Sequence, residues 1–150
     1  MGTALSDVYD LFMMQCTDYR LTDLFATSED DFETYLEAWL KFAVVDFRAC
    51  TQSVVFNSDT KAFTATLTSE NQVILATLML KYLMQKNVND ITQMNLHIRD
   101  RDFNIYSESQ NMKEKRATLN AVKEQCAQLL NDYDFSHNDW SEWNSQIFNG

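Results

Sequence analysis

The chain has almost no residues that interrupt regular backbone structure. Residues 3–149 contain neither proline nor glycine, and the two glycines are Gly2 and Gly150. Tight hairpin turns usually require glycine, so this absence argues against an all-β fold. It also excludes the glycine-rich phosphate loops GxxxxGK(S/T) and GxGxxG and the GxSxG nucleophile elbow. We therefore expect a helical chain with no glycine-based phosphate or hydrolase site.

Size and composition indicate one globular domain. The chain has 150 residues, of which 45% are hydrophobic and 13% aromatic. A chain of this length buries enough surface to form a core without added cross-links. Its apolar content is also too high for a disordered chain.

Helical spacing of apolar residues predicts helices over about 5–16, 20–26, 28–52, 68–84 and 107–131. Ser6, Ser28 and Ser69 are the expected N-caps, because a serine oxygen accepts a hydrogen bond from the open N–H groups of a first turn. Residues 73–84 are apolar nearly all round and are expected at the centre of the core. The residues expected to point inward from the second and third helices are Leu21, Leu24, Phe25, Phe32, Tyr35, Leu36, Trp39, Ala43, Phe47 and Cys50.

Two segments depart from the helical pattern. Residues 53–67 are β-like around the turn cluster 57–60, and residues 87–106 have no clear period. The expected fold class is therefore mainly α. It is a helical bundle with a long C-terminal helix, a short β-hairpin or extended arm near 53–67 and a protruding loop near 87–106.

A seven-residue repeat marks the last helix. Met112, Leu119, Cys126 and Tyr133 follow one another every seven residues, and Lys115 interrupts the accompanying stripe. This repeat is typical of a helix that packs along another helix.

Charge is unevenly distributed along the chain, whose net charge is -10. Residues 1–60 hold 3 basic and 11 acidic side chains, whereas residues 99–123 hold 6 and 4. Such polarity can serve self-assembly, or it can simply be a solvated surface. The residues expected to form unlike inter-subunit charge patches are the acidic Glu33 and Glu37 and the basic Lys113, Arg116 and Lys123.

Two further segments are candidates for contact with other chains. The tail, residues 134–150, contains no Lys or Arg, and its aromatic residues are typical of anchors in a partner's groove. The alternative is that the tail folds back onto the domain. The run Arg99, Asp100, Arg101, Asp102 and Phe103 is either a solvated loop or an inter-subunit arm.

Reactive side chains form no recognisable site. Cys16, Cys50 and Cys126 have no CxxC or zinc spacing and are expected to be buried free thiols, while the two histidines lack metal-site spacing. We therefore expect no enzyme activity, no metal and no cofactor. Without a secretory signal, and with its longest apolar stretch only 12 residues long, the chain is expected in the cytoplasm and not in a membrane.

Several segments together resemble the head-to-tail connector proteins (adaptor, head-completion or neck proteins) of tailed bacteriophages. They are DYRLTDL at 18–24, EDDFETYLEAWLKFAVVDF at 29–47, LTSENQVILATLMLKYLMQKNVN at 67–89, RDFNIYSESQNMKEKR at 101–116 and LLNDYDF at 129–135. The missing proline after the apolar helix and the Trp-rich end depart from that pattern.

The resemblance implies a structural virion protein in the neck, assembled in the host cytoplasm. It implies a ring of identical copies, expected to be a dodecamer, between the portal protein and a stopper or tail-completion protein. Double-stranded DNA would pass through it without sequence-specific binding. A connector domain over 1–133 would carry the tail 134–150, which is expected to dock on the portal through Phe135, Trp140, Trp143, Ile147 and Phe148.

Two other functions fit the sequence. A small acidic protein can inhibit a nucleic-acid-binding enzyme by mimicking DNA, and the chain's charge and size suit that role. A helical interaction module of a cellular complex shares most features with the connector and differs only in its partner.

Overall fold

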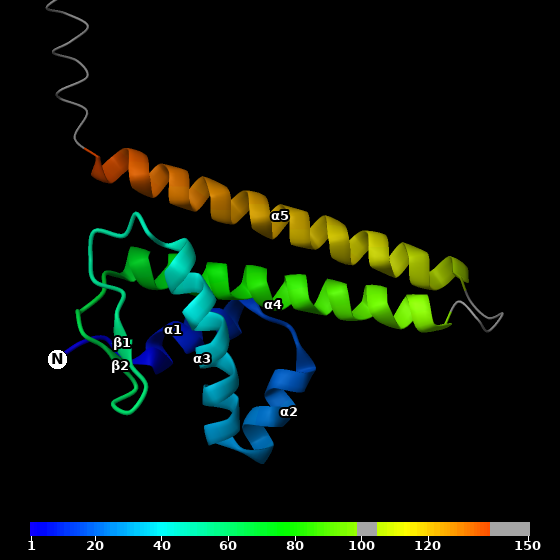
Figure 1. Cartoon of the computed structure of the whole chain (residues 1–150), viewed down its shortest axis with the longest axis horizontal. Helices are drawn as coiled ribbons and strands as arrows, with labels where there is room; N and C mark the ends of the chain where they lie inside the picture. The colour runs from blue at the N-terminus through cyan, green and yellow to red at the C-terminus, as the bar shows by residue number, and fades with distance from the viewer. Residues whose placement is uncertain (99–104, 139–150) are drawn as a thin grey trace, which may run out of the picture.

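The computed structural model describes residues 1–98 and 105–138, with side chains described for 1–93 and 110–138. The described residues form five helices and one small antiparallel sheet, so the expected mainly α fold with a long C-terminal helix is confirmed (Figure 1). In chain order the elements are α1 (Leu5–Gln15), α2 (Tyr19–Thr27), α3 (Glu29–Asp46), β1 (Phe56–Asn57), β2 (Ala62–Phe63), α4 (Ser69–Ile98) and α5 (Ile105–His137).

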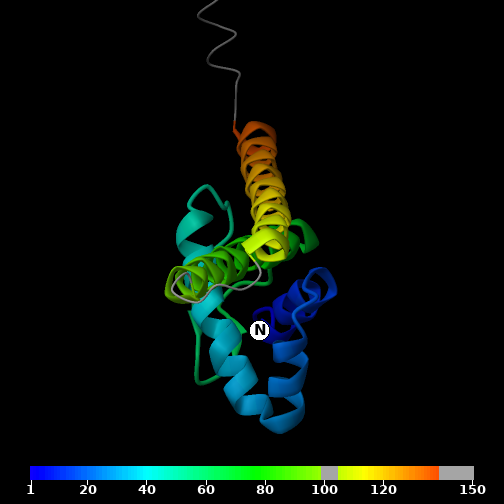
Figure 2. The same cartoon turned by 90° about the vertical axis from the view of Figure 1, so that its right-hand side faces the viewer.

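Helix α4 is the centre of the molecule. Helices α1 and α3 pack on one side of it and α5 lies along the other (Figures 1 and 2). Every side chain from Ile74 to Leu80 is buried, as the all-round apolar pattern predicts. Full burial of a large aliphatic side chain contributes about 1.5–3 kcal/mol, so this one helix supplies much of the core's stabilisation.

Helix α5 packs on α4 through a narrow stripe. The four residues of the seven-residue repeat, Met112, Leu119, Cys126 and Tyr133, are all buried, together with Val122. Most other described side chains of α5 are exposed. With 33 residues the helix is about 50 Å long. The repeat therefore correctly predicts a helix that pairs along its length, and we call this contact the α4–α5 seam.

The prediction of a protruding loop near 87–106 is wrong over most of that range. Helix α4 continues to Ile98 and α5 begins at Ile105, so the connection is confined to 99–104, outside the described residues. Val88 is buried in a second cluster with Met112 and Leu119 of α5. This contact between helices, which no local period reveals, stabilises the second half of α4.

The predicted boundary between residues 133 and 134 also falls inside a helix, because α5 extends to His137. Two local interactions support this last turn. The Ser136 hydroxyl donates to the Tyr133 carbonyl at 3.0 Å, and the His137 ring stacks on the Tyr133 ring at 3.9 Å.

Helix ends agree only in part with the expected caps. Ser28 caps α3, since its Oγ accepts from the Asp31 N–H at 3.3 Å. Ser6 does not cap α1, because the Leu5 N–H donates instead to the Lys61 carbonyl at 2.9 Å. At the start of α4 the cap is Thr68, not Ser69, and its Oγ1 accepts from the Asn71 N–H.

Two other expectations for α2 and α3 are wrong. Phe25 is 51% exposed and meets Phe32 edge-on instead of entering the core. Helix α3 ends at Asp46, not near Gln52, since the backbone leaves the helical conformation at Phe47, whose ψ is 50°, and Gln52 bonds instead to the segment before α4. Its side-chain amide donates to the Thr66 carbonyl and accepts from the Thr68 N–H, both at 2.8 Å.

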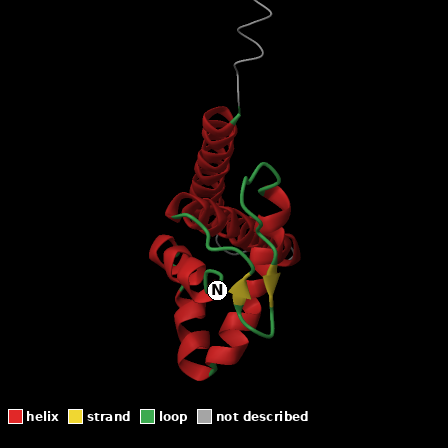
Figure 3. Cartoon of the chain, turned by 90° about the vertical axis from the view of Figure 1, so that its left-hand side faces the viewer, coloured by secondary structure: helices red, strands yellow, loops and turns green. Residues whose placement is uncertain are grey.

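The predicted hairpin is present and packs on the N-terminus (Figure 3). Phe56 pairs with Phe63, and Lys61 in the turn has a left-handed φ of 51°. The Phe63 N–H donates to the Thr3 carbonyl at 2.8 Å, so the first residues of the chain extend this small sheet. An isolated two-stranded hairpin is marginal in water, and this additional pairing stabilises it.

Replacing Tyr133 by phenylalanine should lower the free energy of unfolding by about 1 kcal/mol, because the Thr51 N–H would lose the hydroxyl that accepts from it at 3.0 Å. Urea denaturation followed by circular dichroism measures the change. Tyr19→Phe is the matched control, since Tyr19 is 84% exposed, and it should change stability by less than about 0.5 kcal/mol. Equal losses for the two variants would contradict the anchoring role of Tyr133.

Glu37 makes stability depend on pH. A hydrogen bond from the Ser58 hydroxyl, which outweighs the opposing effect of burial, together with Lys41 and Lys61 lowers the pKa of Glu37. A carboxyl with a lowered folded pKa stabilises above its unfolded pKa of about 4.3, and this stabilisation is lost as pH falls through the folded pKa.

We expect Ser58→Ala to reduce the loss of stability between about pH 6 and about pH 3, because less of the Glu37 pKa shift remains. Urea titrations at several pH values across that range measure the free energy of unfolding. Ser6→Ala is the control, because the exposed Ser6 side chain has no hydrogen bond among the described residues. A wild-type pH profile for Ser58→Ala would show that Glu37 does not carry this dependence.

Candidate functional site

Helix α5 carries unpaired positive charge. Lys113, Lys115, Arg116 and Lys123 are exposed, and none forms an ion pair within the described part of the chain. The cations before residue 99 behave differently. The ones that pair with nearby carboxylates are Arg20, Lys41, Lys61, Lys81 and Lys86. Apart from Arg48 after α3, net positive surface charge is therefore concentrated in residues 113–123 of α5, where Glu114 is the one acid, whereas the acids Glu124, Asp132 and Asp134 follow toward the end of the helix.

The acidic residues expected to face those cations are used inside the chain. Glu37 is 7% exposed, accepts from the Ser58 hydroxyl at 2.6 Å and pairs with Lys41 at 2.9 Å. Lys61 lies 3.6 Å from the Glu33 carboxylate and 4.0 Å from that of Glu37. Glu37 is thus part of a polar cluster that fastens the hairpin turn to α3, and it is not a free surface charge.

Other acids remain exposed on α1–α3. They occupy the first turn of α3 and the outer sides of α1 and α2, and no ion pair involves them among the described residues. These residues are Asp7, Asp10, Asp23, Glu29, Asp30 and Asp31. The acids in the first turn of α3 also stabilise that helix, because their negative charge meets the positive end of the helix dipole.

A groove of about 620 Å³ runs between the α1–α2 link, α4 and α5. Its apolar lining comes from Leu80, Leu83, Met84, Val88, Ile91 and Val122. At about 100° per residue, Lys115 lies on the same side of α5 as the seam residues Met112, Leu119 and Val122. It is nevertheless exposed and lines this groove, which we call the Lys115 groove. The interruption that the sequence shows in the heptad stripe thus corresponds to an opening beside the seam.

The acidic groups of the Lys115 groove are neutralised. The Asp18 carboxylate accepts two hydrogen bonds from the Arg20 guanidinium, at 3.1 and 2.9 Å, which lower the pKa of Asp18. Arg20 also donates to Asn87 of α4 at 2.8 Å, and Asp90 pairs with Lys86. Lys115 is therefore the charged lining residue without an ion-pair partner among the described residues.

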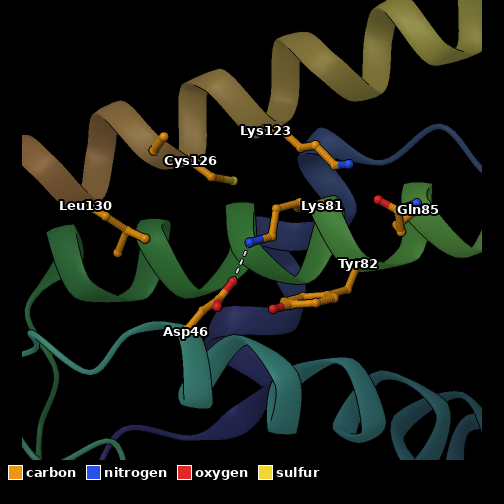
Figure 4. A pocket seen from close by; sticks show the side chains of 8 residues that line it. Asp46, Lys81, Tyr82, Gln85, Lys123, Cys126 and Leu130 are labelled. Carbon is orange, nitrogen blue, oxygen red and sulfur yellow. Dashed lines mark hydrogen bonds and ion pairs between the residues drawn. The ribbon is translucent and has the colours of Figure 1, made fainter.

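A second cleft, of about 380 Å³, lies between the end of α3, α4 and α5 (Figure 4). Lys81 pairs with Asp46, and its ammonium lies 4.6 Å from the centre of the Tyr82 ring. Burial opposes ionisation of Asp46, but hydrogen bonds from Lys81 and Tyr82 outweigh it and lower its pKa. Burial, with that same hydrogen bond, raises the pKa of Tyr82 to about 12. The cleft therefore holds a neutralised ion pair and a protonated phenol.

The third group in this cleft, the Cys126 thiol, is also unreactive. Its Sγ donates to the Thr77 carbonyl at 3.5 Å, and burial raises its pKa. All three cysteines are free thiols, as expected, although Cys16 and Cys50 are only partly buried.

An aromatic row crosses from α3 to α4 and includes one residue that the sequence pattern missed. Phe42 lies off the predicted inward stripe, is 53% exposed and stacks on Trp39 at 6.1 Å and on Tyr82 at 5.2 Å. Only the position of Tyr82 on α4 makes this contact possible, because Tyr82 is 40 residues away in the sequence.

The remaining predicted site residues divide into two groups. Lys113, Arg116 and Lys123 are exposed on α5, and Phe135 in its last turn is 70% exposed. The others lie outside the described residues, namely Arg99, Asp100, Arg101, Asp102, Phe103, Trp140, Trp143, Ile147 and Phe148.

No family model, no curated protein and no solved structure matches the chain. Among residues 1–98 and 105–138, no helix is both long and apolar enough to cross a bilayer. In the same residues, no group of three or more His, Cys, Asp or Glu side chains is arranged to hold a metal ion.

The thiols test how tightly the α4–α5 seam closes. In the native reduced protein, we expect iodoacetamide to modify Cys126 at least about tenfold more slowly than Cys50, since Cys126 is 2% exposed and its pKa is raised. Peptide mass spectrometry over time measures each site. In denaturing urea the three rates should converge. Equal native rates would show that the seam opens.

Proposed function

We propose that this chain is a structural assembly protein that forms a homo-oligomeric ring in the neck of a tailed bacteriophage. One observation carries the self-assembly: among the described residues, 113–123 of α5 present four unpaired cations against one acid, Glu114, whereas α1–α3 present the unpaired acids Asp7, Asp10, Asp23 and Glu29 to Asp31. A closed ring needs heterologous contacts, in which one patch meets a different patch on the next copy. Unlike charge on two sides of one chain suits such a contact.

The acidic half of this contact differs from the one expected from sequence. Glu33 and Glu37 are paired with Lys61 and Lys41 inside the chain. The acids at the start of α3, Glu29 to Asp31, are exposed and unpaired within the described residues, so we assign them to the interface with Arg116 and Lys123 of the next copy.

The resemblance to connector proteins supplies the partners in this proposal. The ring, proposed as a dodecamer, joins the portal protein to a stopper or tail-completion protein and lets double-stranded DNA pass. A net charge of -10 suits a DNA conduit, because tight phosphate binding depends on Lys and Arg contacts.

The exposed cations of α5 count against the DNA-mimic alternative. An inhibitor of a cationic DNA-binding enzyme needs a continuous negative face, and Lys113, Lys115 and Arg116 interrupt it. A helical module of a cellular complex has no specific observation in its favour.

Reversing the charge of α5 should block neck assembly. In a phage that lacks this gene and is complemented with Arg116→Glu/Lys123→Glu, we expect DNA-filled heads without tails and roughly tenfold fewer tailed particles, since two unlike contacts become repulsive. Electron microscopy counts the particles. Adding Glu29→Lys/Asp30→Lys should restore part of the yield, because the reversed charges match again.

Arg48→Glu is the control, because Arg48 is exposed and follows the end of α3, outside both the first turn of α3 and helix α5. Normal yields from the α5 variant would contradict the charged interface. Tailed particles that form without the chain would overturn the proposed function itself.

A further inference from the structure

We propose that the Lys115 groove binds the aromatic segment 139–148 of a second copy of this chain. The inference rests on the proposed self-assembly and deepens it, because it assigns a specific pair of surfaces to the contact between copies. Three observations carry it: the lining of the groove, its charge, and the distance that the segment has to span.

The groove offers a prepared apolar surface at a place where the core is incomplete. Lys115 stands on the seam side of α5, where Met112 and Leu119 are buried, yet it is exposed. The groove beside it is lined by apolar side chains of α4 and has a volume of about 620 Å³. Pockets of this size and lining accept apolar groups, and an aromatic side chain buries about 150–250 Å² on docking.

The charge of the groove complements that of the segment. Asp18 and Asp90 are neutralised by Arg20 and Lys86, which leaves the Lys115 ammonium as the unpaired charge of the lining within the described residues. The segment contains Asp139 and Glu142 but no Lys or Arg, and Glu142 lies between Trp140 and Trp143. An indole placed in the apolar lining, with the Glu142 carboxylate beside the Lys115 ammonium, matches both the apolar surface and the positive charge of the groove.

The reach of the chain identifies the occupant as another copy. Twenty-three residues of chain separate Lys115 from residue 138, and at 1.5 Å per residue along the helix this spans about 35 Å. Glu142 is four residues beyond 138, so its backbone reaches at most about 14 Å even when fully extended, and the Glu142 and Lys115 side chains together are too short to close the remaining gap. Glu142 therefore cannot pair with Lys115 of its own chain, whereas a second copy sets no such limit.

The cleft beside Lys81 is a poorer site for the same segment. It is smaller, at about 380 Å³, Asp46 already neutralises Lys81 there, and its Lys123, unpaired within the described residues, is the residue assigned above to the charged contact with Glu29 to Asp31. Its own carboxylate would also face an acidic segment.

Mixing two variants of the full chain tests the assignment. Lys115→Glu disables the groove and leaves the segment intact, while Trp140→Ala/Trp143→Ala does the reverse. Under reducing conditions, native mass spectrometry should show self-association of the wild type and at least about tenfold weaker association of each variant alone. Their mixture should form a one-to-one complex that grows no further, because it retains one intact groove and one intact segment.

Two additional variants make the result specific. Lys115→Glu/Glu142→Lys should regain self-association, since the opposite charges are restored in exchanged positions. Arg48→Glu changes charge equally outside the groove and should behave as wild type. Circular dichroism confirms that each variant keeps its helical content.

Three results would overturn the inference. The wild type could stay monomeric, the variants could associate as well as the wild type, or the mixture could give no complex. If the tryptophan variant self-associates normally but no longer joins heads to tails, the segment binds a different protein such as the portal. That outcome rejects the groove assignment and leaves the proposed neck function standing.

Discussion

The fold depends on the complete burial of α4. Helix α4, with its buried run from Ile74 to Leu80, contacts α1 and α3 on one side and α5 on the other, so these helices are joined mainly through it. This arrangement explains why a chain with two strands of two residues each still forms a defined hairpin. The hairpin and the N-terminal residues lie against a core that α4 has already organised, and Phe63 enters that core.

The seam between α4 and α5 combines a regular stripe with one irregular position. Tyr133 anchors the C-terminal part of α5 through Phe47 and Thr51, while Met112 and Leu119 anchor the other end against Val88. Between them, Lys115 places a charge where an apolar side chain would close the contact. Burying an unpaired ammonium is costly, so the side chain stays exposed and the adjoining surface remains open. Neighbouring positions of α5 therefore have different roles: Met112 and Leu119 stabilise the fold, and Lys115 leaves a surface open for binding.

Internal ion pairing determines which charges the chain presents to other molecules. Ion pairs that are exposed to solvent, such as Lys86–Asp90, contribute little to stability, typically about 0–1 kcal/mol each. Their effect on the surface is larger, because Lys41, Lys61 and Lys86 neutralise carboxylates that the sequence offers as free. What remains are the cations of residues 113–123 on α5 and the acids along α1–α3, and this separation favours association of unlike faces over a uniformly repelling surface.

The sequence by itself determined the helical class, the central position of residues 73–84 and the side of α5 that is buried. Each follows from local information, since missing glycine and proline restrict turns and a repeat of seven places residues on one face of a helix. Only the tertiary structure decided that residues 87–98 are helical, that Glu37 is buried beneath the hairpin turn, and that Lys115 borders a groove. Those outcomes depend on partners far away in the chain, namely Met112, Ser58 and the α1–α2 link. Local periodicity carries no information about such partners, because contacts between distant segments exist only after the helices have packed.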